Sequence, residues 1–201
     1  KTANYLIENQ FIEVVAAPNF TKAAIEQFKS KKNVRLLEVK NQKKINPGLK
    51  FHSVDSGLLV QSIDTGEIEN KNLIVATEKK PNKEELKNAM FAWKVCKYVK
   101  SNAIVYASKN QTLGIGAGQM SRIDSAEIAA KKAKKAGFNL NGSCMASDAF
   151  FPFRDSIDEA AKNGISCIIQ PGGSIKDDEV ILAANEANMI MILTGMRHFR
   201  H

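Results

Sequence analysis

Short apolar segments alternate with helical segments along most of this chain, and this alternation limits the possible folds more than any other feature. Strands that alternate with helices of about 10 to 15 residues are typical of a layered α/β sheet. The polar residues 109–111 separate two strands closely enough to predict a hairpin, so we expect a mixed sheet with one antiparallel pair. The predicted strands cover 11–16, 34–39, 56–62, 73–76, 102–108, 112–117, 166–170 and 189–193. The predicted helices cover 21–32, run from Pro81 to about residue 99 and from 124 or 125 to 135, and end at Asn163 and Asn188.

Two regions follow from the distribution of polar residues. The first 39 residues read as a β-α-β unit, and Asn41 to Lys50 is a polar stretch with Pro47-Gly48, as in a loop or linker. We therefore place a boundary near residue 50. The chain begins without an initiator Met or a signal pattern, so we expect it to be part of a longer protein.

The net charge of +8 comes from 29 Lys and Arg against 21 Asp and Glu. Twelve of the lysines fall in three groups within 29–44, 79–83 and 131–135, and such groups usually form solvated faces. RNA binding is the alternative interpretation, and we expect no nucleic acid partner. No apolar run approaches the ~20 residues of a membrane helix, so we expect no span. Three cysteines without CxxC spacing predict no disulfide framework and favour the cytoplasm.

A glycine-rich stretch, Gly114-Ile115-Gly116-Ala117-Gly118, lies at the end of the second strand of the predicted hairpin. It is not a dinucleotide-binding fingerprint, because Gln119 stands where the third glycine of G-x-G-x-x-G belongs. One interpretation is a strand whose small residues allow close backbone approach. The other is a binding role for the residues that follow, since Arg122 can recognise an anion or a carbonyl group in a bidentate manner.

Three further segments could carry chemistry. The loop 148–155 contains Phe150, Phe151 and Phe153, which either anchor the core or form a wall on which a flat heterocycle stacks. Ser174 and Asp177 form a variant of the capping box. The acids in that first helical turn make a bound phosphate unlikely, whereas a neutral ligand on the Gly-Gly-Ser backbone stays open.

The last segment is the chain end, 194–201. It is either a frayed terminus or an anion-binding segment with four cationic or titratable side chains, Arg197, His198, Arg200 and His201. If it is extended, Arg197, Phe199 and His201 share one face. The spacing of cysteines and histidines excludes a zinc deaminase motif and a nucleophile elbow, so we expect no metal.

Several of these stretches together resemble one enzyme family. They are 93–95, 100–105, 114–122, 147–155, 170–175 and 195–201, and they are similar to the C-terminal part of the bifunctional purine biosynthesis enzymes that join an aminoimidazole carboxamide ribonucleotide (AICAR) formyltransferase to an IMP cyclohydrolase. The resemblance implies a three-layer α/β/α fold of the cytidine-deaminase type without zinc. Residues 1–50 would end the first such subdomain and 51–201 would form the second.

The resemblance also implies an activity and a site. The activity is formyl transfer from 10-formyltetrahydrofolate, as co-substrate, to the 5-amino group of AICAR in IMP biosynthesis. Matched positions imply that AICAR is held by Asn102, Arg122, Phe150 and Arg197, and the folate by Ile123, Asp155, Ser174 and Ile175. The implied assembly is a homodimer with sites between subunits.

One departure from the family pattern limits the activity of this chain. The Lys-His dipeptide that performs acid/base work in the family does not occur in these 201 residues, and the cyclohydrolase domain is absent too. We therefore expect the chain alone to be inactive. His201 is the remaining titratable base beside the matched site, and we assign it a supporting role.

Overall fold

The computed structural model describes residues 1–40 and 48–201, which form two compact units, Lys1–Ile63 and Asp64–His201. The expected linker at 41–50 lies largely outside the described residues. The division between the units comes after Ile63 rather than near residue 50. The reason is a strand that sequence reasoning did not anticipate, β3 (Leu49–Val54), which pairs with β4 (Gly57–Ser62) and belongs to the first unit.

The first unit contains the predicted β-α-β arrangement. β1 (Val14–Ala17) pairs in parallel with β2 (Arg35–Glu38), and α2 (Lys22–Phe28) connects them. Thr21 caps α2, because its hydroxyl oxygen accepts from the Ala24 N–H at 3.2 Å. The predicted strand at 11–16 begins at Val14 instead, and α1 (Thr2–Asn9) was not predicted.

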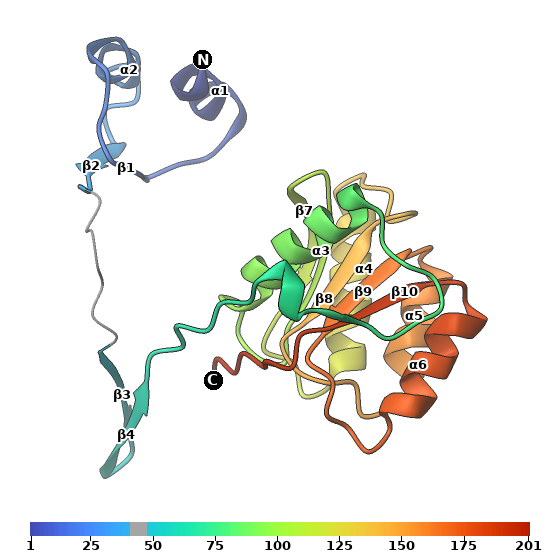
Figure 1. Cartoon of the computed structure of the whole chain (residues 1–201). Helices are drawn as coiled ribbons and strands as arrows, with labels where there is room; N and C mark the ends of the chain where they lie inside the picture. The colour runs from blue at the N-terminus through green and yellow to red at the C-terminus, as the bar shows by residue number, and fades with distance from the viewer. Residues whose placement is uncertain (41–47) are drawn as a thin grey trace. The chain divides into compact units, whose positions relative to one another are not determined.

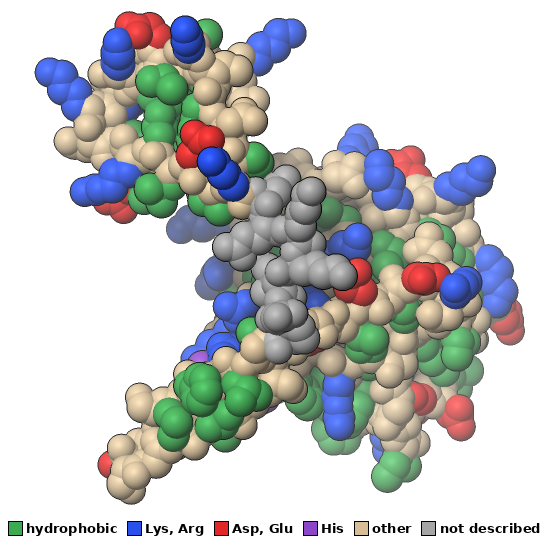
Figure 2. All heavy atoms as spheres, turned by 60° about the vertical axis from the view of Figure 1, so that its left-hand side comes forward, with side chains coloured by type: hydrophobic (Ala, Val, Ile, Leu, Met, Phe, Trp, Pro, Cys, Tyr) green, Lys and Arg blue, Asp and Glu red, His purple; other side chains and the backbone are tan. Residues whose placement is uncertain are grey.

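Hydrophobic side chains gather on the β3–β4 hairpin of this unit (Figure 2). Between 46% and 59% of each is exposed, and they are Leu49, Phe51, Val54, Leu58, Leu59 and Val60. A two-stranded hairpin alone is marginally stable in water. An apolar surface of this kind is typical of an element that is covered by another surface.

The second unit is built on a six-stranded mixed sheet with the order β5-β10-β9-β8-β6-β7 (Figure 1). β8, β9 and β10 run parallel, whereas β6 is antiparallel to both its neighbours and β5 is antiparallel to β10. The strands are β5 (Ile74–Val75), β6 (Ile104–Ser108), β7 (Gln111–Gly116), β8 (Cys144–Ser147), β9 (Cys167–Gln170) and β10 (Ile190–Leu193). The predicted hairpin at 102–117 is confirmed as β6 and β7. β8 was missed, because its sequence Cys-Met-Ala-Ser lacks the β-branched and aromatic residues that mark strands.

Helices cover both faces of this sheet, so the three-layer α/β/α arrangement is confirmed (Figure 1). One face packs against α3 (Lys83–Cys96), and the other packs against α4 (Arg122–Lys135), α5 (Asp155–Lys162) and α6 (Asp177–Glu186). Side chains along β6 alternate between the layers: Ile104 and Tyr106 lie on the α4 side, and Val105 and Ala107 lie on the α3 side. A short 3₁₀ turn, η1 (Asn70–Asn72), precedes β5. No helix among the described residues is long and apolar enough to cross a membrane.

The glycines of β7 allow α4 to lie directly against the strand. A Cβ on Gly116 would overlap the Ser125 carbonyl group, and one on Gly114 would lie 2.9 Å from the carbonyl carbon of Ala129. The interpretation of close backbone approach is therefore confirmed. The expected cap of α4 is wrong: Ser121 is the N-cap, not Asp124 or Ser125, because the Ser121 hydroxyl accepts from the Asp124 N–H at 3.1 Å.

Candidate functional site

The candidate site lies along one edge of the six-stranded sheet. The carboxyl ends of β7, β8, β9 and β10 meet there with the amino end of β6, since Ile104 lies opposite both Gly116 and Ser147. Loops at the carboxyl ends of strands commonly build binding sites in α/β proteins. The topology brings every segment with a predicted site residue to this edge, and those residues are Asn102, Arg122, Ile123, Phe150, Asp155, Ser174, Ile175, Arg197 and His201.

A buried ion pair stands at the centre of this edge. Arg122, in the first turn of α4, donates from Nη2 to Oδ1 of Asp148 at 3.2 Å. The Arg122 side chain is 13% exposed and that of Asp148 is fully buried. Arg122 Nε and Asp148 Oδ2 are also buried, and neither has a hydrogen-bond partner among the described residues. An unpaired buried polar group is costly, so the pair leaves hydrogen-bonding capacity unused at this place.

Asn102 holds the loop that leads into α4. Its side-chain Nδ2 donates to the carbonyl oxygens of Gln119 (2.9 Å) and Met120 (3.1 Å). The backbone carbonyl oxygen of Asn102 accepts a hydrogen bond from Ser125 Oγ at 2.7 Å. Both N–H groups of the amide are therefore used within the protein, and Oδ1 is the atom that a ligand can reach as an acceptor.

The aromatic residues of the loop after β8 differ in how far they are buried. Phe151 is fully buried and anchors the core, whereas Phe150 is partly buried and Phe153 is 58% exposed. The core-anchoring interpretation is therefore confirmed for Phe151, and the stacking wall stays a prediction for Phe150 and Phe153. Asp155 opens α5 at the surface, and its Oδ1 accepts from the Ser156 N–H at 2.6 Å.

In the Gly-Gly-Ser turn after β9, the backbone N–H groups of all three residues, 172–174, are hydrogen-bonded. The N–H of Gly172 donates to Gln170 Oε1 (2.7 Å), and those of Gly173 and Ser174 donate to the carboxylate of Asp177 (2.6 and 3.2 Å). Asp177 therefore occupies the place that a phosphate would take. A neutral ligand can use only carbonyl groups and side chains here, of which Ile175 is fully exposed.

The chain end is fixed rather than frayed. The N–H of Ser101 donates to Arg200 O at 2.9 Å, and the N–H of Arg200 donates to Ser101 Oγ at the same distance. Arg197 lies 5.2 Å from the Phe199 ring centroid, and the rings of Phe199 and His201 are 5.4 Å apart, so the predicted shared face is confirmed. His198 is an exception to the predicted cationic set, because it is buried against Trp93.

Sequence reasoning assigned no role to Asp148 and overlooked an apolar rim along the edge. The loops after β7, β8, β9 and the end of the chain each expose one large apolar side chain, by 45% to 102%: Met120, Phe153, Ile175 and Phe199. Asp148 could have been recognised as a site residue by its position directly after a strand. That strand is β8, whose residues Cys-Met-Ala-Ser did not predict a strand. Solvent-exposed apolar groups in one region are typical of a surface that binds a flat or apolar partner.

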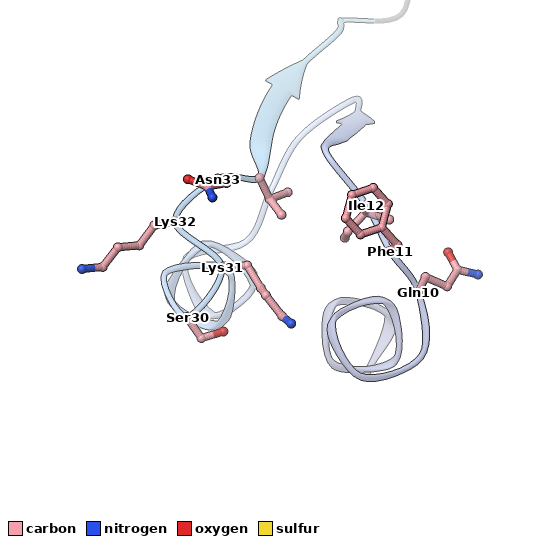
Figure 3. Close-up of a pocket in the computed structure, with 8 residues that line it drawn as sticks. Gln10, Phe11, Ile12, Ser30, Lys31, Lys32 and Asn33 are labelled. Carbon is pink, nitrogen blue, oxygen red and sulfur yellow. The ribbon is translucent and has the colours of Figure 1, made fainter.

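The structure also describes a cavity in the first unit and the three cysteines. A cavity of about 330 Å³ in the first unit lies between the α1–β1 and α2–β2 connections, and no predicted site residue lines it (Figure 3). The three cysteines are buried and free. Within residues 1–40 and 48–201, no group of three or more His, Cys, Asp or Glu side chains could hold a metal ion.

Two solved structures show weak similarity to this chain. One is a diaminohydroxyphosphoribosylaminopyrimidine deaminase/5-amino-6-(5-phosphoribosylamino)uracil reductase from Thermotoga maritima, with 15% identity and a TM-score of 0.33 over 55% of this chain. The chain spans about a third of that protein, 35% of its length. The other is a dCMP deaminase from the cyanophage S-TIM5 in apo form, with 12% identity and a TM-score of 0.38, over 55% of this chain and 98% of that one.

A family model gives the stronger comparison. The model of the AICARFT/IMPCHase bienzyme matches residues 1–132, about two thirds of the chain. The match includes Asn102, Arg122 and Ile123, whereas the later site residues lie beyond it. The chain therefore belongs to the AICARFT/IMPCHase bienzyme family of purine biosynthesis enzymes.

Proposed function

We propose that the second unit forms part of a site in which a formyl group moves from 10-formyltetrahydrofolate to the 5-amino group of AICAR. The observation that carries this proposal is the Arg122–Asp148 pair at the sheet edge where the matched segments meet. Its guanidinium group is oriented by a fully buried carboxylate, and its Nε has no hydrogen-bond partner in residues 1–40 and 48–201. A fixed arginine of this kind is suited to carbonyl and anion recognition.

The side chains along the edge complement the functional groups of AICAR. Arg122 donates to the carboxamide oxygen, and Oδ1 of Asn102 accepts from an amino group of the ligand. Phe150 stacks on the imidazole ring. Arg197 is exposed and binds the phosphate with a two-pronged hydrogen bond. Each of these groups matches the ligand in polarity and charge.

The apolar rim suits the folate. Met120, Phe153, Ile175 and Phe199 supply exposed apolar area for the flat rings of a reduced folate. Asp155 accepts hydrogen bonds from amino and ring N–H groups of the pterin, and Ile123 and Ser174, which the resemblance assigns to the folate, contact the same molecule. The Gly-Gly-Ser turn, whose N–H groups are already paired, suits the uncharged portion of the molecule.

The reaction requires orientation and proton transfer. The 5-amino nitrogen attacks the formyl carbon, the new C–N bond forms, and the bond from the formyl carbon to the folate nitrogen breaks. The amine loses a proton to a base, and the leaving folate nitrogen takes up a proton, which gives tetrahydrofolate. This amine is a weak nucleophile because it is conjugated with the ring and the carboxamide, so proximity must supply much of the acceleration. His201 is exposed and acts in support, while the Lys-His pair expected upstream performs the main acid/base step.

The proposed assembly is a homodimer with sites between subunits. The apolar β3–β4 hairpin supports this proposal, because its large side chains are about half exposed in the single chain. Such a surface is typical of an element that a partner subunit covers. Sedimentation of the full-length protein at several concentrations tests this. A monomer at all concentrations would contradict the assembly.

The test of the activity is folate-dependent formylation of AICAR by the full-length protein. Arg197→Ala raises KM for AICAR, because the fork of Arg197 is not replaced by water. The control is Arg35→Ala, an exposed arginine of the first unit, which leaves KM unchanged. Full-length protein that forms no formylated AICAR would refute the proposal.

The isolated 201-residue chain gives a second test. It binds AICAR or folate weakly but does not turn over, because acid/base catalysis worth about 10²- to 10⁴-fold is missing. His201→Ala in the full-length protein causes a partial loss. If the isolated chain formylated AICAR at the full-length rate, proton transfer would belong to His201 instead.

A further inference from the structure

His198 is buried in the middle of an otherwise exposed cationic segment. Arg197 and Phe199 on either side of it are exposed, whereas His198 is 2% exposed. Its ring lies 4.7 Å from that of Trp93 on α3. Alternation along an extended backbone explains this placement, since neighbouring side chains point to opposite sides. The inward side chain therefore fixes the segment that presents Arg197 outward.

The side chain of His198 is bound by Asp64, the first residue of the second unit in the sequence. Nδ1 of His198 lies 2.5 Å from Oδ2 of Asp64, although the two residues are 134 positions apart. The other oxygen of Asp64 accepts from the Gly66 N–H at 2.9 Å and lies 3.7 Å from Lys97 Nζ. Lys97 also donates to Gly66 O at 2.7 Å. Asp64 is thus itself held in place by the loop that follows it.

The surroundings keep Asp64 ionised. Burial works against the charged form, but the Gly66 N–H, the His198 ring and the charge of Lys97 together lower the pKa of Asp64. Other charged and titratable groups around this pair line an adjacent cavity of about 190 Å³, and they are Glu67, Lys94 and Tyr98. The carboxylate accepts a hydrogen bond from Nδ1 whether the imidazole is neutral or protonated.

The same histidine connects Arg197 to the buried ion pair. The backbone N–H of His198 donates to the carbonyl oxygen of Asp148 at 2.9 Å, and the side chain of Asp148 orients Arg122. The hydrogen bond between His198 and Asp148 therefore joins the segment that carries Arg197 to the residue that orients Arg122. A shift of His198 along its segment would move Arg197 relative to Arg122.

We infer that the His198–Asp64 pair positions Arg197 for the phosphate of AICAR, an inference that rests on the proposed function. Neither residue is a catalytic residue, because the imidazole ring is buried and its Nδ1 is occupied by Asp64. Their contribution is to fix the backbone that carries a long, flexible side chain before the ligand arrives. A group held in its bound position loses less conformational freedom on binding.

The test is a double-mutant cycle in the full-length protein with Asp64→Asn and Arg197→Ala. Asp64→Asn raises KM for AICAR by about 2- to 12-fold, the range expected when one mobile side chain must be immobilised on binding. The value of kcat and KM for the folate stay within about twofold. Glu69→Gln removes a carboxylate from the same segment at an exposed position, and it leaves KM unchanged.

The cycle separates positioning from a general structural effect. If Asp64 acts through Arg197, Asp64→Asn has no further effect on KM in the Arg197→Ala background. Equal effects in both backgrounds, or an unchanged KM in the single variant, would overturn the inference. Should Asp64→Asn fail to fold, His198→Phe replaces it in the same cycle, because the ring packing against Trp93 is kept and the hydrogen bond to Asp64 is lost.

The two proposals fail in different ways. Wild-type protein that neither binds nor formylates AICAR contradicts the proposed function, and the inference falls with it. Active wild-type protein with an additive cycle contradicts the inference alone.

Discussion

The contact between β7 and α4 gives a prediction whose magnitude follows from the geometry. In Gly116→Ala, the new Cβ would overlap the carbonyl oxygen of Ser125 and lie 2.5 Å from the carbonyl carbon. Ordinary contacts begin at about 3.4 Å, so the carbonyl carbon alone requires a shift of the helix by about 1 Å, and the closer oxygen requires more. The obstacle is backbone, and no rotamer change can relieve it. Four buried alanines pack along α4 and would lose contact with the sheet: Ala126, Ala129, Ala130 and Ala133.

Overpacking a dense interior costs about 1 to 3 kcal/mol, and a backbone clash belongs at the upper end, so we expect about 3 kcal/mol. That corresponds to a fall in Tm of roughly 6 to 12 °C for a chain of this size. Urea unfolding and calorimetry measure both quantities. The variant also weakens AICAR binding, because α4 carries Arg122 at its first position.

Gly137→Ala is the matched control. Gly137 has φ +79° and nothing within 4 Å of a new Cβ, so its cost is conformational alone, about 1 to 2 kcal/mol. Gly116 lacks this constraint on φ and tests the steric contact alone. A Gly116→Ala protein no less stable than Gly137→Ala would refute the reasoning.

Three other predictions concern charged groups and cysteines of the second unit. Arg122→Ala leaves the carboxylate of Asp148 buried without its cation, so urea unfolding should show a loss of about 3 to 5 kcal/mol, and a change below 1 kcal/mol would contradict it. The pKa of Asp64 is lowered from 3.8, so its contribution to stability is complete above that value and lost as the pH falls below it. The difference in unfolding free energy between wild type and Asp64→Asn, followed by Trp93 fluorescence, should therefore be smaller at about pH 2.5 than at about pH 5. A thiol reagent should label no cysteine of the folded chain and all three in urea, since these thiols are buried: Cys96, Cys144 and Cys167.

The elements with strong local signals were predicted correctly. The β6–β7 hairpin follows from the turn at Lys109 and Asn110, both of which have positive φ. α3 follows from Pro81 and the apolar spacing behind it, and the structure adds a complete capping box between Asn82 and Glu85. Local propensity and tertiary packing favour the same structure in these segments.

The misses have tertiary causes. β8 is a strand because its neighbours β6 and β9 pair with it on both sides, and its residues Cys-Met-Ala-Ser alone do not favour that state. Ser121 rather than Asp124 caps α4, because the loop held by Asn102 brings the hydroxyl to the first turn. Neither interaction is visible in the local sequence.

Local sequence patterns were enough to predict the alternation of strands and helices, the mixed sheet and the segments that carry the candidate site. They were enough because periodicity and turn residues act over a few positions of the chain. How these segments meet became visible in the folded protein. The pairing of Arg122 with Asp148 and of His198 with Asp64 joins residues 26 and 134 positions apart. Each pair contains one buried side chain, Asp148 or His198, whose polar atom depends on the other residue for a partner. Such long-range contacts depend on the order of strands in the sheet, which local patterns do not encode.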